Sequence, residues 1–520
     1  MNKQLLQKKF LEVGSSTALS RIIGVFREKL MAHFVGATLG ADAFFTAFKI
    51  PNTLRKVFAE GALSAAFIPT LVQTFRAEGK DAASRLMTLT FIIFEGIVLL
   101  LCALGIYKAA FIVSCIAPGW NAEKVALTVP LLQILMPFIF FISSSALFTG
   151  ALQAVHHFFI PAFSPVLLNI VFVIALIVCL HFNLSLLVLC YSIIFGGFIQ
   201  FLAHVIMYYK LGFGFPPINA KALKPFWHVC VKFLLCLPAV SIVELSLFVD
   251  TSFASYLPDG SIALIYYANR FMGIPMGVFA VALSTILLPH FSRISTYAPK
   301  RLSFYVLEST KLIFWVTVPA TIIMMFFSQE IFVTIFMSKK FTMAHVLEGK
   351  NILIAYLIGL FFLSLNKILL NIYYAFQNMW FPATISIAAA ITNGFLDYAL
   401  VRIYNYGATG LALATVASGI VQTILFIIGL KYCFNFTFYY ASFFHFCAHY
   451  IAQLCIVLGI FFGIYQLLYY ALNLCCSTTI AYLLFNTMFF WLWVGPLCII
   501  IYICLYALRK QWPIPSYFLD

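Results

Sequence analysis

Long apolar runs, separated by short polar stretches, follow one another along almost the whole chain of 520 residues. They recur about every 30 to 40 residues, and each approaches the roughly 20 residues that an α-helix needs to cross a lipid bilayer. The runs are too long for the short alternating strands of a membrane barrel. The pattern therefore predicts an all-α polytopic membrane protein with about fourteen transmembrane helices. The predicted spans are residues 11–36, 42–74, 86–107, 126–149, 156–180, 184–209, 226–252, 261–290, 304–328, 344–376, 382–403, 408–431, 447–471 and 479–508.

The composition agrees with a chain that lies mostly in hydrocarbon, because 64% of its residues are hydrophobic and only 9% are charged. The first ten residues are basic, but no compact apolar core with a small-residue cleavage site follows them, so we expect no cleavable signal peptide. The net charge of +15 would suggest nucleic acid as the partner of a soluble protein. No soluble domain is predicted that could present a basic face, so we expect no nucleic-acid binding.

The distribution of Lys and Arg between the predicted loops indicates the orientation in the membrane. The termini and the even-numbered loops carry 16 of the 31 basic residues, whereas the opposite loops carry 6. Cytoplasmic loops are enriched in Lys and Arg, so both termini are predicted to be cytoplasmic. The remaining nine basic residues lie inside the predicted spans.

Six of these nine form a cluster of cations where the chain is expected to cross the membrane. A guanidinium at the bilayer centre costs between about 3 and more than 10 kcal/mol, so such residues usually face a wet cavity. The cations outnumber the nearby acids, and Arg grips phosphate through two parallel hydrogen bonds, so a phosphorylated or pyrophosphorylated ligand is favoured over a cationic drug. The alternative is that Arg–Glu pairs only fasten the helices together. The six cations are Arg21, Arg27, Lys49, Arg55, Lys56 and Arg270, and the polar residues predicted near them are Glu28, Asp42, Asn52 and Glu60.

A second polar cluster is predicted in the C-terminal half. Asn393 and Asp397 are four residues apart and therefore share one face of a helix. Asp250 ends the seventh predicted helix, and Thr415 lies in the twelfth. Carboxylate, amide and hydroxyl oxygens are the ligands that a sodium ion prefers. A proton relay and simple helix-end hydrogen bonding are equally compatible with these residues.

Other cofactors are not expected. The thirteen cysteines are scattered through apolar segments without metal-ligand spacing, which is typical of small buried hydrophobic residues. The chain has no GxxxxGK[ST] loop for ATP. Any uphill movement of a ligand would therefore draw on an ion gradient, the membrane potential or the concentration of the ligand itself.

Two stretches about 220 residues apart resemble each other. Residues 58–69 and 279–289 align with one gap, matching Phe-Ala, Ala-Leu-Ser and Pro, and each follows a helix interrupted by a proline, Pro51 or Pro275. Breaks at corresponding places in two halves indicate a binding site between repeats that rock around a central cavity. Chance similarity of apolar segments and tolerated proline kinks are the alternatives. The repeats predict two parallel six-helix lobes, residues 1–215 and 216–435, and two extra helices in residues 436–520.

Three motifs carry a resemblance to a known family. They are Ser20-Arg-Ile-Ile-Gly-Val-Phe-Arg27, Ala41-Asp-Ala-Phe-Phe-Thr-Ala-Phe-Lys-Ile-Pro-Asn52 with Leu54-Arg-Lys-Val-Phe-Ala-Glu-Gly61, and Tyr266-Tyr-Ala-Asn-Arg-Phe-Met-Gly-Ile-Pro275 with Ala282-Leu-Ser-Thr-Ile-Leu-Leu-Pro289. These segments resemble the signature of the MurJ (MviN) lipid II flippases. The resemblance is dense over about residues 15–75 and 240–295, and elsewhere it rests on the number and length of the helices.

The resemblance implies a fold of the multidrug/oligosaccharidyl-lipid/polysaccharide exporter superfamily with two extra C-terminal helices that form a groove for a lipid tail. It implies a transporter of the bacterial inner membrane rather than an enzyme. The implied substrate is lipid II, the undecaprenyl pyrophosphate-linked peptidoglycan precursor, with membrane lipids and the cell-wall synthesis machinery as further partners. Family residues needed for function fall on Arg21, Arg27, Arg55, Arg270 and Asp42, and a family sodium site falls on Asp250, Asn393, Asp397 and Thr415. Glu28 replaces an Asp that is frequent in the family, and Asn269 precedes Arg270 where many relatives have Asp.

Three rival functions remain open at this point. A drug exporter of the same superfamily would prefer an acidic, aromatic cavity, which the excess of arginines disfavours. A membrane enzyme acting on polyprenyl phosphate would need clustered Asp residues for a metal, and no DDxxD-type run occurs. A flippase for another polyprenyl-linked glycan would share the same charges, so only the family motifs separate it from a lipid II flippase.

Overall fold

The computed structural model describes residues 19–509 except 21, 156, 298 and 476–483, and for several helical residues within this range it describes the backbone but not the side chain. The described chain is almost entirely helical, and its β-structure is limited to one bridge between Ser338 and Phe341. The chain folds into two compact units, Met1–Ala263 and Leu264–Asp520. The prediction of an all-helical polytopic protein is confirmed.

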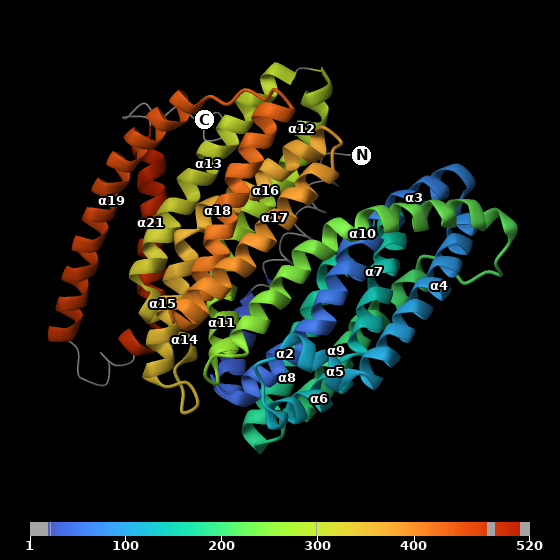
Figure 1. The fold of residues 1–520 in the computed structure, drawn as a ribbon, viewed down its shortest axis with the longest axis horizontal. Coiled ribbons are helices and arrows are strands. Elements are labelled where there is room, and N and C mark those ends of the chain that lie inside the picture. Colours follow the sequence, from blue (N-terminus) through green and yellow to red (C-terminus); the bar gives the residue numbers. More distant parts are fainter. Residues whose placement is uncertain (1–18, 21, 156, 298, 476–483, 510–520) are drawn as a thin grey trace. The chain divides into compact units, whose positions relative to one another are not determined.

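Unit 1 consists of helices packed side by side (Figure 1). A helix over residues 22–35 comes first. The helices that follow are α2 Leu39–Arg55, η1 Lys56–Gly61, α3 Ala62–Glu78, α4 Lys80–Tyr107, α5 Ala109–Ile116, α6 Ala122–Leu135, α7 Phe138–Ala154, α8 Phe159–Phe182, α9 Leu186–Lys210 and α10 Ala220–Ala254.

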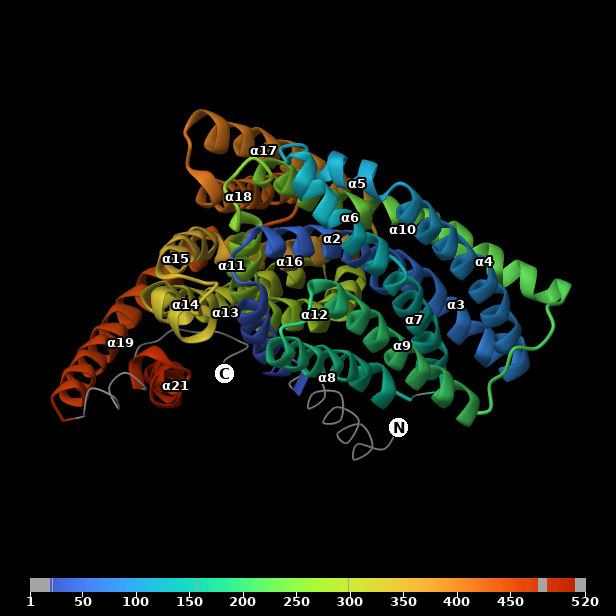
Figure 2. The same ribbon diagram turned by 90° about the horizontal axis from the view of Figure 1, so that it is seen from below.

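Aromatic side chains and small residues hold unit 1 together. α9 packs along both α8 and α7, as Figure 2 also shows, and the rings of Phe148 on α7 and Tyr208 on α9 meet edge to face at 5.0 Å. Gly150 lets α7 approach α3, because a Cβ there would lie 3.1 Å from side-chain atoms of Phe67 and Ile68. α3 also packs against α10, so α10 belongs to this unit.

Unit 2 begins within the helix that follows the α10 loop. Its helices are α11 Ser261–Pro275, η2 Met276–Val281, α12 Ala282–Tyr297, α13 Pro299–Phe326, α14 Ser328–Phe336, α15 Met343–Ile358, α16 Leu360–Ala375, α17 Trp380–Asp397, η3 Tyr398–Ile403, α18 Gly407–Cys433, α19 Tyr440–Cys475 and α21 Phe490–Leu508.

Two apolar cores stabilise unit 2. One lies between α12, α13, α16, α17 and α18 and includes Phe291, Tyr373 and Phe426. The other joins α13 to the two C-terminal helices α19 and α21 through buried rings such as Phe327 and Tyr450. The Tyr450 hydroxyl of α19 donates a hydrogen bond to the backbone oxygen of Trp315 in α13 at 2.6 Å. This bond also joins the two helices.

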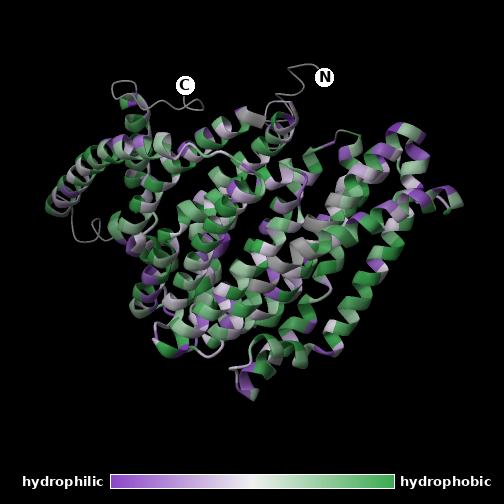
Figure 3. Cartoon of the chain, turned by 45° about the horizontal axis from the view of Figure 1, so that its top comes forward, coloured by the Kyte–Doolittle hydropathy of each residue, from purple (hydrophilic) through white to green (hydrophobic). Residues whose placement is uncertain are grey.

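Ten helices of the described chain are long and apolar enough to cross a membrane, or eleven if the bent pair α15 and α16 is one span. Figure 3 shows the apolar residues along these helices. The three predicted spans outside this set are 11–36, 42–74 and 226–252, which hold nearly all the charge predicted inside the spans of unit 1. Each of these three stretches includes residues that the structure leaves undescribed in whole or in their side chains, so their crossing of the membrane stays a prediction.

The two predicted interruptions are π-helical turns rather than breaks in the helix. η1 follows α2, which contains Pro51, and η2 follows Pro275 at the end of α11. A π turn inserts one residue into a helix and is frequent at functional sites. Each π turn therefore widens the helix locally, and the helix continues without a break into α3 or α12.

Candidate functional site

Arg27 is held by an acid and an amide in the helix over residues 22–35. Its guanidinium lies 2.5 Å from the Glu28 carboxylate and donates to the Asn169 side-chain oxygen at 2.9 Å. The guanidinium also lies 5.1 Å from the centre of the Phe172 ring. The Arg27 side chain is 15% exposed and that of Glu28 only 4% exposed. Arg21, the other predicted cation of this helix, lies outside the described residues.

Arg55 and Asn52 form a pair at the end of α2. The Arg55 Nε donates to the Asn52 side-chain oxygen at 3.0 Å, and both residues are half-buried. This contact uses a neutral acceptor, so it leaves the charge of Arg55 unchanged. Glu60 lies in η1, and its side chain is outside the described part of the chain.

The two lysines of this region both reach α10. Lys49 donates to the backbone oxygen of Leu247 and to the hydroxyl of Thr251. Lys56, in η1, donates to both carboxylate oxygens of Glu244 at 3.0 and 3.1 Å. Glu244 is buried, whereas the Lys56 side chain is 35% exposed. Sequence reasoning did not single out Glu244, although a carboxylate inside the predicted span 226–252 was a visible signal.

Asp42 is buried and receives two backbone hydrogen bonds at the beginning of α11. Its carboxylate accepts from Gly260 N at 2.7 Å and from Ala263 N at 2.8 Å. Gly260 has φ +91°, and a Cβ there would lie 2.5 Å from the Ala37 oxygen, so only glycine fits. Asp42 therefore acts as a cap supplied by α2 to the N-terminus of α11, where a negative charge is favoured.

The described cations of unit 1 are thus partly neutralised. Glu28 offsets Arg27 and Glu244 offsets Lys56, while Lys49 and Arg55 also donate hydrogen bonds to neutral oxygens. Partial neutralisation is what allows these cations to lie in an apolar protein.

Arg270 lies in α11, five residues before Pro275, and its side chain is exposed. It belongs to unit 2, while Arg27 and Arg55 belong to unit 1. The convergence of these arginines on one ligand remains a prediction.

The predicted oxygen cluster is compact in unit 2. The Asn393 amide donates to Asp397 Oδ2 at 3.0 Å, and Ser418 donates to the Asn393 oxygen at 3.1 Å. Asp397 is fully buried. The Thr415 hydroxyl donates to Leu411 O of its own helix. Ser418 was not predicted, because nothing in the sequence distinguishes it from other serines of apolar helices.

The oxygen atoms of this cluster are the type of ligand that a hard cation such as sodium prefers. Asp397, Asn393 and Ser418 offer carboxylate, amide and hydroxyl oxygens within one buried network. Asp250, half-buried in the last turn of α10, belongs to unit 1. Within the described ranges, no group of three or more His, Cys, Asp or Glu side chains is arranged to hold a metal ion.

These features define a polytopic membrane protein with charged side chains among its helices. A solved structure described as lipid II flippase MurJ in an inward closed conformation matches with a TM-score of 0.77 and 25% identity over 97% of this chain and 99% of that one. An inward-facing multidrug resistance MATE family transporter of the MOP superfamily matches with a TM-score of 0.70 at 12% identity, covering 78% of this chain and 93% of that chain. The second similarity shows the fold only.

Sequence comparison gives the family. The lipid II flippase MurJ of Burkholderia cenocepacia is 34% identical over 435 residues, covering 82% of this chain and 84% of the relative. The probable lipid II flippase MurJ of Buchnera aphidicola subsp. Schizaphis graminum is 34% identical over 422 residues, covering 78% and 80%. The family model described as lipid II flippase MurJ matches residues 31–485. The chain therefore belongs to the MurJ family, whose members are membrane transporters and not enzymes.

Proposed function

We propose that this protein moves lipid II, the undecaprenyl pyrophosphate-linked disaccharide peptide, across the bacterial cytoplasmic membrane by alternating access. The observation that carries the proposal is membership of the MurJ family together with half-buried cations at the family positions Arg27 and Arg55. A diphosphate concentrates negative charge on a few neighbouring oxygens, and cations inside the membrane can pair with it. A polyprenyl-linked glycan with another sugar would use the same cations, and family membership favours lipid II.

The pyrophosphate would bind among Arg21, Arg27, Arg55 and Arg270. Arg27 already faces Glu28, so binding requires the diphosphate to compete with that carboxylate for the guanidinium. The diphosphate carries more charge than one carboxylate and accepts several hydrogen bonds at once, which favours the exchange. Asp42 supports the site indirectly in this proposal, because it holds the first turn of the helix that bears Arg270.

The proposed architecture has fourteen spans in two six-helix lobes, residues 1–215 and 216–435, followed by two extra helices in residues 436–520. The π turns η1 and η2 support the repeat, since each overlaps the beginning of one of the two similar stretches, residues 58–69 and 279–289. The lobes would rock around a central cavity, with both chain termini in the cytoplasm. The undecaprenyl tail would lie in a groove beside α19 and α21, whose many exposed apolar side chains suit contact with lipid.

Sodium is the proposed coupling ion, with the membrane potential as a second source of energy. Asp250, Asn393, Asp397 and Thr415 would hold it, and the buried oxygens of Asp397 and Asn393 support this choice. Loss of sodium-dependent thermal stabilisation in Asp397→Asn would agree with the site. The absence of any sodium effect on the unmutated protein would reject it.

Complementation tests the pyrophosphate site. In cells depleted of their own flippase, Arg27→Ala and Arg270→Ala should fail to support growth, and Arg27→Lys should support it only weakly because Lys lacks the two-point fork. Lys108, at the junction of α4 and α5, provides a control, and Lys108→Ala should behave like the unmutated protein. Full growth with Arg27→Ala or Arg270→Ala, at normal protein levels, would refute the site.

A further inference from the structure

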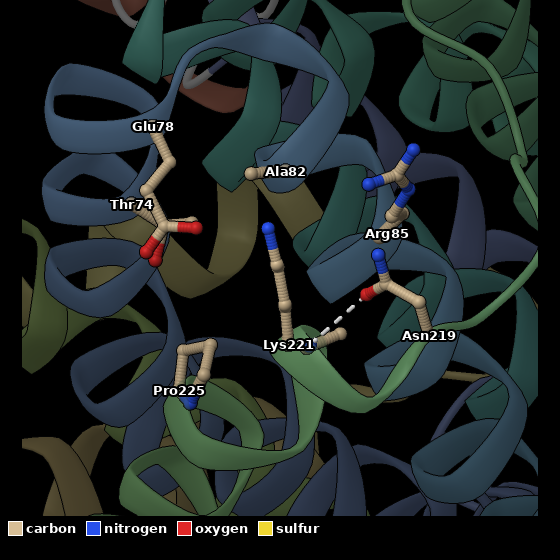
Figure 4. A pocket seen from close by; sticks show the side chains of 8 residues that line it. Thr74, Glu78, Ala82, Arg85, Asn219, Lys221 and Pro225 are labelled. Atoms are coloured by element: carbon tan, nitrogen blue, oxygen red, sulfur yellow. Dashed lines mark hydrogen bonds between the residues drawn. The ribbon is translucent and has the colours of Figure 1, made fainter.

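A polar cleft lies within unit 1, where the end of α3 and the first turns of α4 and α10 meet (Figure 4). It contains about 250 Å³ of space, part of which is open to solvent. Each of the three helices contributes one charged side chain to its lining: Glu78, Arg85 and Lys221. The cleft is separate from Arg27, Arg55 and the lysines that bind α10 further along.

The three charges have no partner of their own within the described part of the chain. Glu78, Arg85 and Lys221 form no hydrogen bond or ion pair with another described residue, although they line one small space. The Nε of Arg85 is buried and has no acceptor among these residues. Buried donors in proteins are nearly always paired, so an unpaired guanidinium nitrogen beside a cleft points to a ligand that accepts hydrogen bonds.

The N-terminus of α10, a helix of 35 residues, also lines the cleft. The Asn219 side chain caps this helix by accepting from Ala222 N at 3.3 Å, and both residues line the cleft. The dipole of a long helix favours an anion near its N-terminus. Two cations and a helix end thus face the same space, with Glu78 opposite them as the single acid (Figure 4).

The predicted spans place the cleft at the membrane boundary. Glu78 follows the predicted span 42–74, Arg85 precedes 86–107 and Lys221 precedes 226–252, all on the side with the excess of Lys and Arg. The same first turns of α10 expose Leu223 by 55% and Trp227 by 68%. Exposed Trp is typical of the headgroup level of a bilayer. A ligand of this cleft can therefore have its tail in the membrane.

We propose that the cleft binds the phosphoethanolamine headgroup of a membrane phospholipid. The phosphodiester would lie between Arg85, Lys221 and the start of α10, and the ammonium group would lie on Glu78. Two cations and one acid complement this zwitterion, since each charge of the headgroup meets an opposite charge. A headgroup without an amine leaves Glu78 unmatched next to a phosphate, and a choline cannot donate hydrogen bonds to it.

Lipid binding to the purified full-length protein tests the proposal, and lipid II is not needed. Native mass spectrometry with phosphatidylethanolamine, phosphatidylglycerol and phosphatidylcholine of identical acyl chains should show ethanolamine lipid bound about tenfold more tightly than the other two, the effect of roughly one charge-assisted hydrogen bond. Glu78→Gln should abolish the preference over phosphatidylglycerol. Lys221→Gln and Arg85→Gln should weaken the binding of phosphatidylethanolamine and of phosphatidylglycerol about fivefold to tenfold.

Lys224→Gln is the matched control, because Lys224 is exposed on the same turns of α10 and does not line the cleft. It should leave the preference unchanged. Equal binding of the three lipids, a preference that survives Glu78→Gln, or an equal effect of Lys224→Gln and Lys221→Gln would overturn the proposal. So would soluble phosphoethanolamine that displaces the lipid at equal concentration, since the tail would then contribute nothing. None of these results bears on lipid II transport, so the two proposals can fail separately.

Discussion

The two π turns, η1 in unit 1 and η2 in unit 2, share a backbone form but differ in chemistry. η1 contains Lys56, which forms an ion pair with Glu244 on α10. η2 has the sequence MGVFAV without a charged residue, and its Ala280 is fully buried in the apolar core with α12, α13 and α16. The same irregularity therefore carries an ion pair in one unit and an apolar core contact in the other.

The helices that precede the two turns also begin differently. α2 has its own cap, because the Thr38 hydroxyl accepts from Ala41 N at 3.4 Å. α11 instead takes its cap from Asp42, a residue of α2 that is 218 positions before Gly260. The two helices thus differ in the source of the side chain that caps them.

The largest expected effect of a single change is at Asp42. Asp42→Ala leaves two buried N–H groups without an acceptor and should destabilise the protein by about 2–4 kcal/mol, visible as a lower apparent melting temperature in detergent. Thr38→Ala, the corresponding cap of α2, should cost only about 0.5–1 kcal/mol. Equal destabilisation by the two variants would contradict the conclusion that Asp42 caps α11.

The apolar character of η2 predicts the next largest effect. Ala280→Leu forces extra volume into a closed core and should destabilise the protein by about 1–3 kcal/mol, measured by the same melting experiment. Val281→Leu is the control, since Val281 is 42% exposed and has room for one more carbon. Neither variant should change the affinity for a pyrophosphate lipid. A marked change in that affinity would show that η2 takes part in ligand binding.

The ion pair of η1 predicts a gain of affinity. We extend the proposed site to Lys56 and expect Glu244 to compete with the diphosphate for this lysine, so Glu244→Gln should bind undecaprenyl pyrophosphate about threefold to tenfold more tightly. Lys56→Gln should weaken binding by a similar factor. The double variant should then bind like Lys56→Gln alone, because Glu244 acts only through Lys56. Tighter binding in the double variant than in Lys56→Gln would show an independent effect of Glu244.

Hydrophobic periodicity predicts the helices well and their partners poorly. α4, α9 and α18 follow the predicted spans 86–107, 184–209 and 408–431 to within several residues, since long apolar runs have one stable form in a membrane. Glu244 pairs with Lys56 across 188 positions, and Asn169 with Arg27 across 142. Such pairs depend on how each helix is rotated and which helices are neighbours, which no local pattern determines.

The smallest expected effect concerns a third π turn, η3, which directly follows the buried Asp397. Ser418→Ala removes the hydroxyl that donates to Asn393 and should cost about 1 kcal/mol in thermal unfolding without sodium. In the proposed sodium site, the variant should also show reduced stabilisation by sodium, while Ser192→Ala, an exposed serine of α9, should change neither quantity. An unaltered melting temperature for Ser418→Ala would mean that the network contributes little.

Binding of undecaprenyl pyrophosphate, compared with undecaprenyl phosphate, tests most directly whether the intramembrane cations hold a diphosphate. Native mass spectrometry of the purified protein should show the pyrophosphate lipid bound at least about tenfold more tightly, and Arg55→Gln should remove most of that difference. Equal affinity for the two lipids in the unmutated protein, or a difference that Arg55→Gln and Arg27→Gln leave intact, would contradict the account.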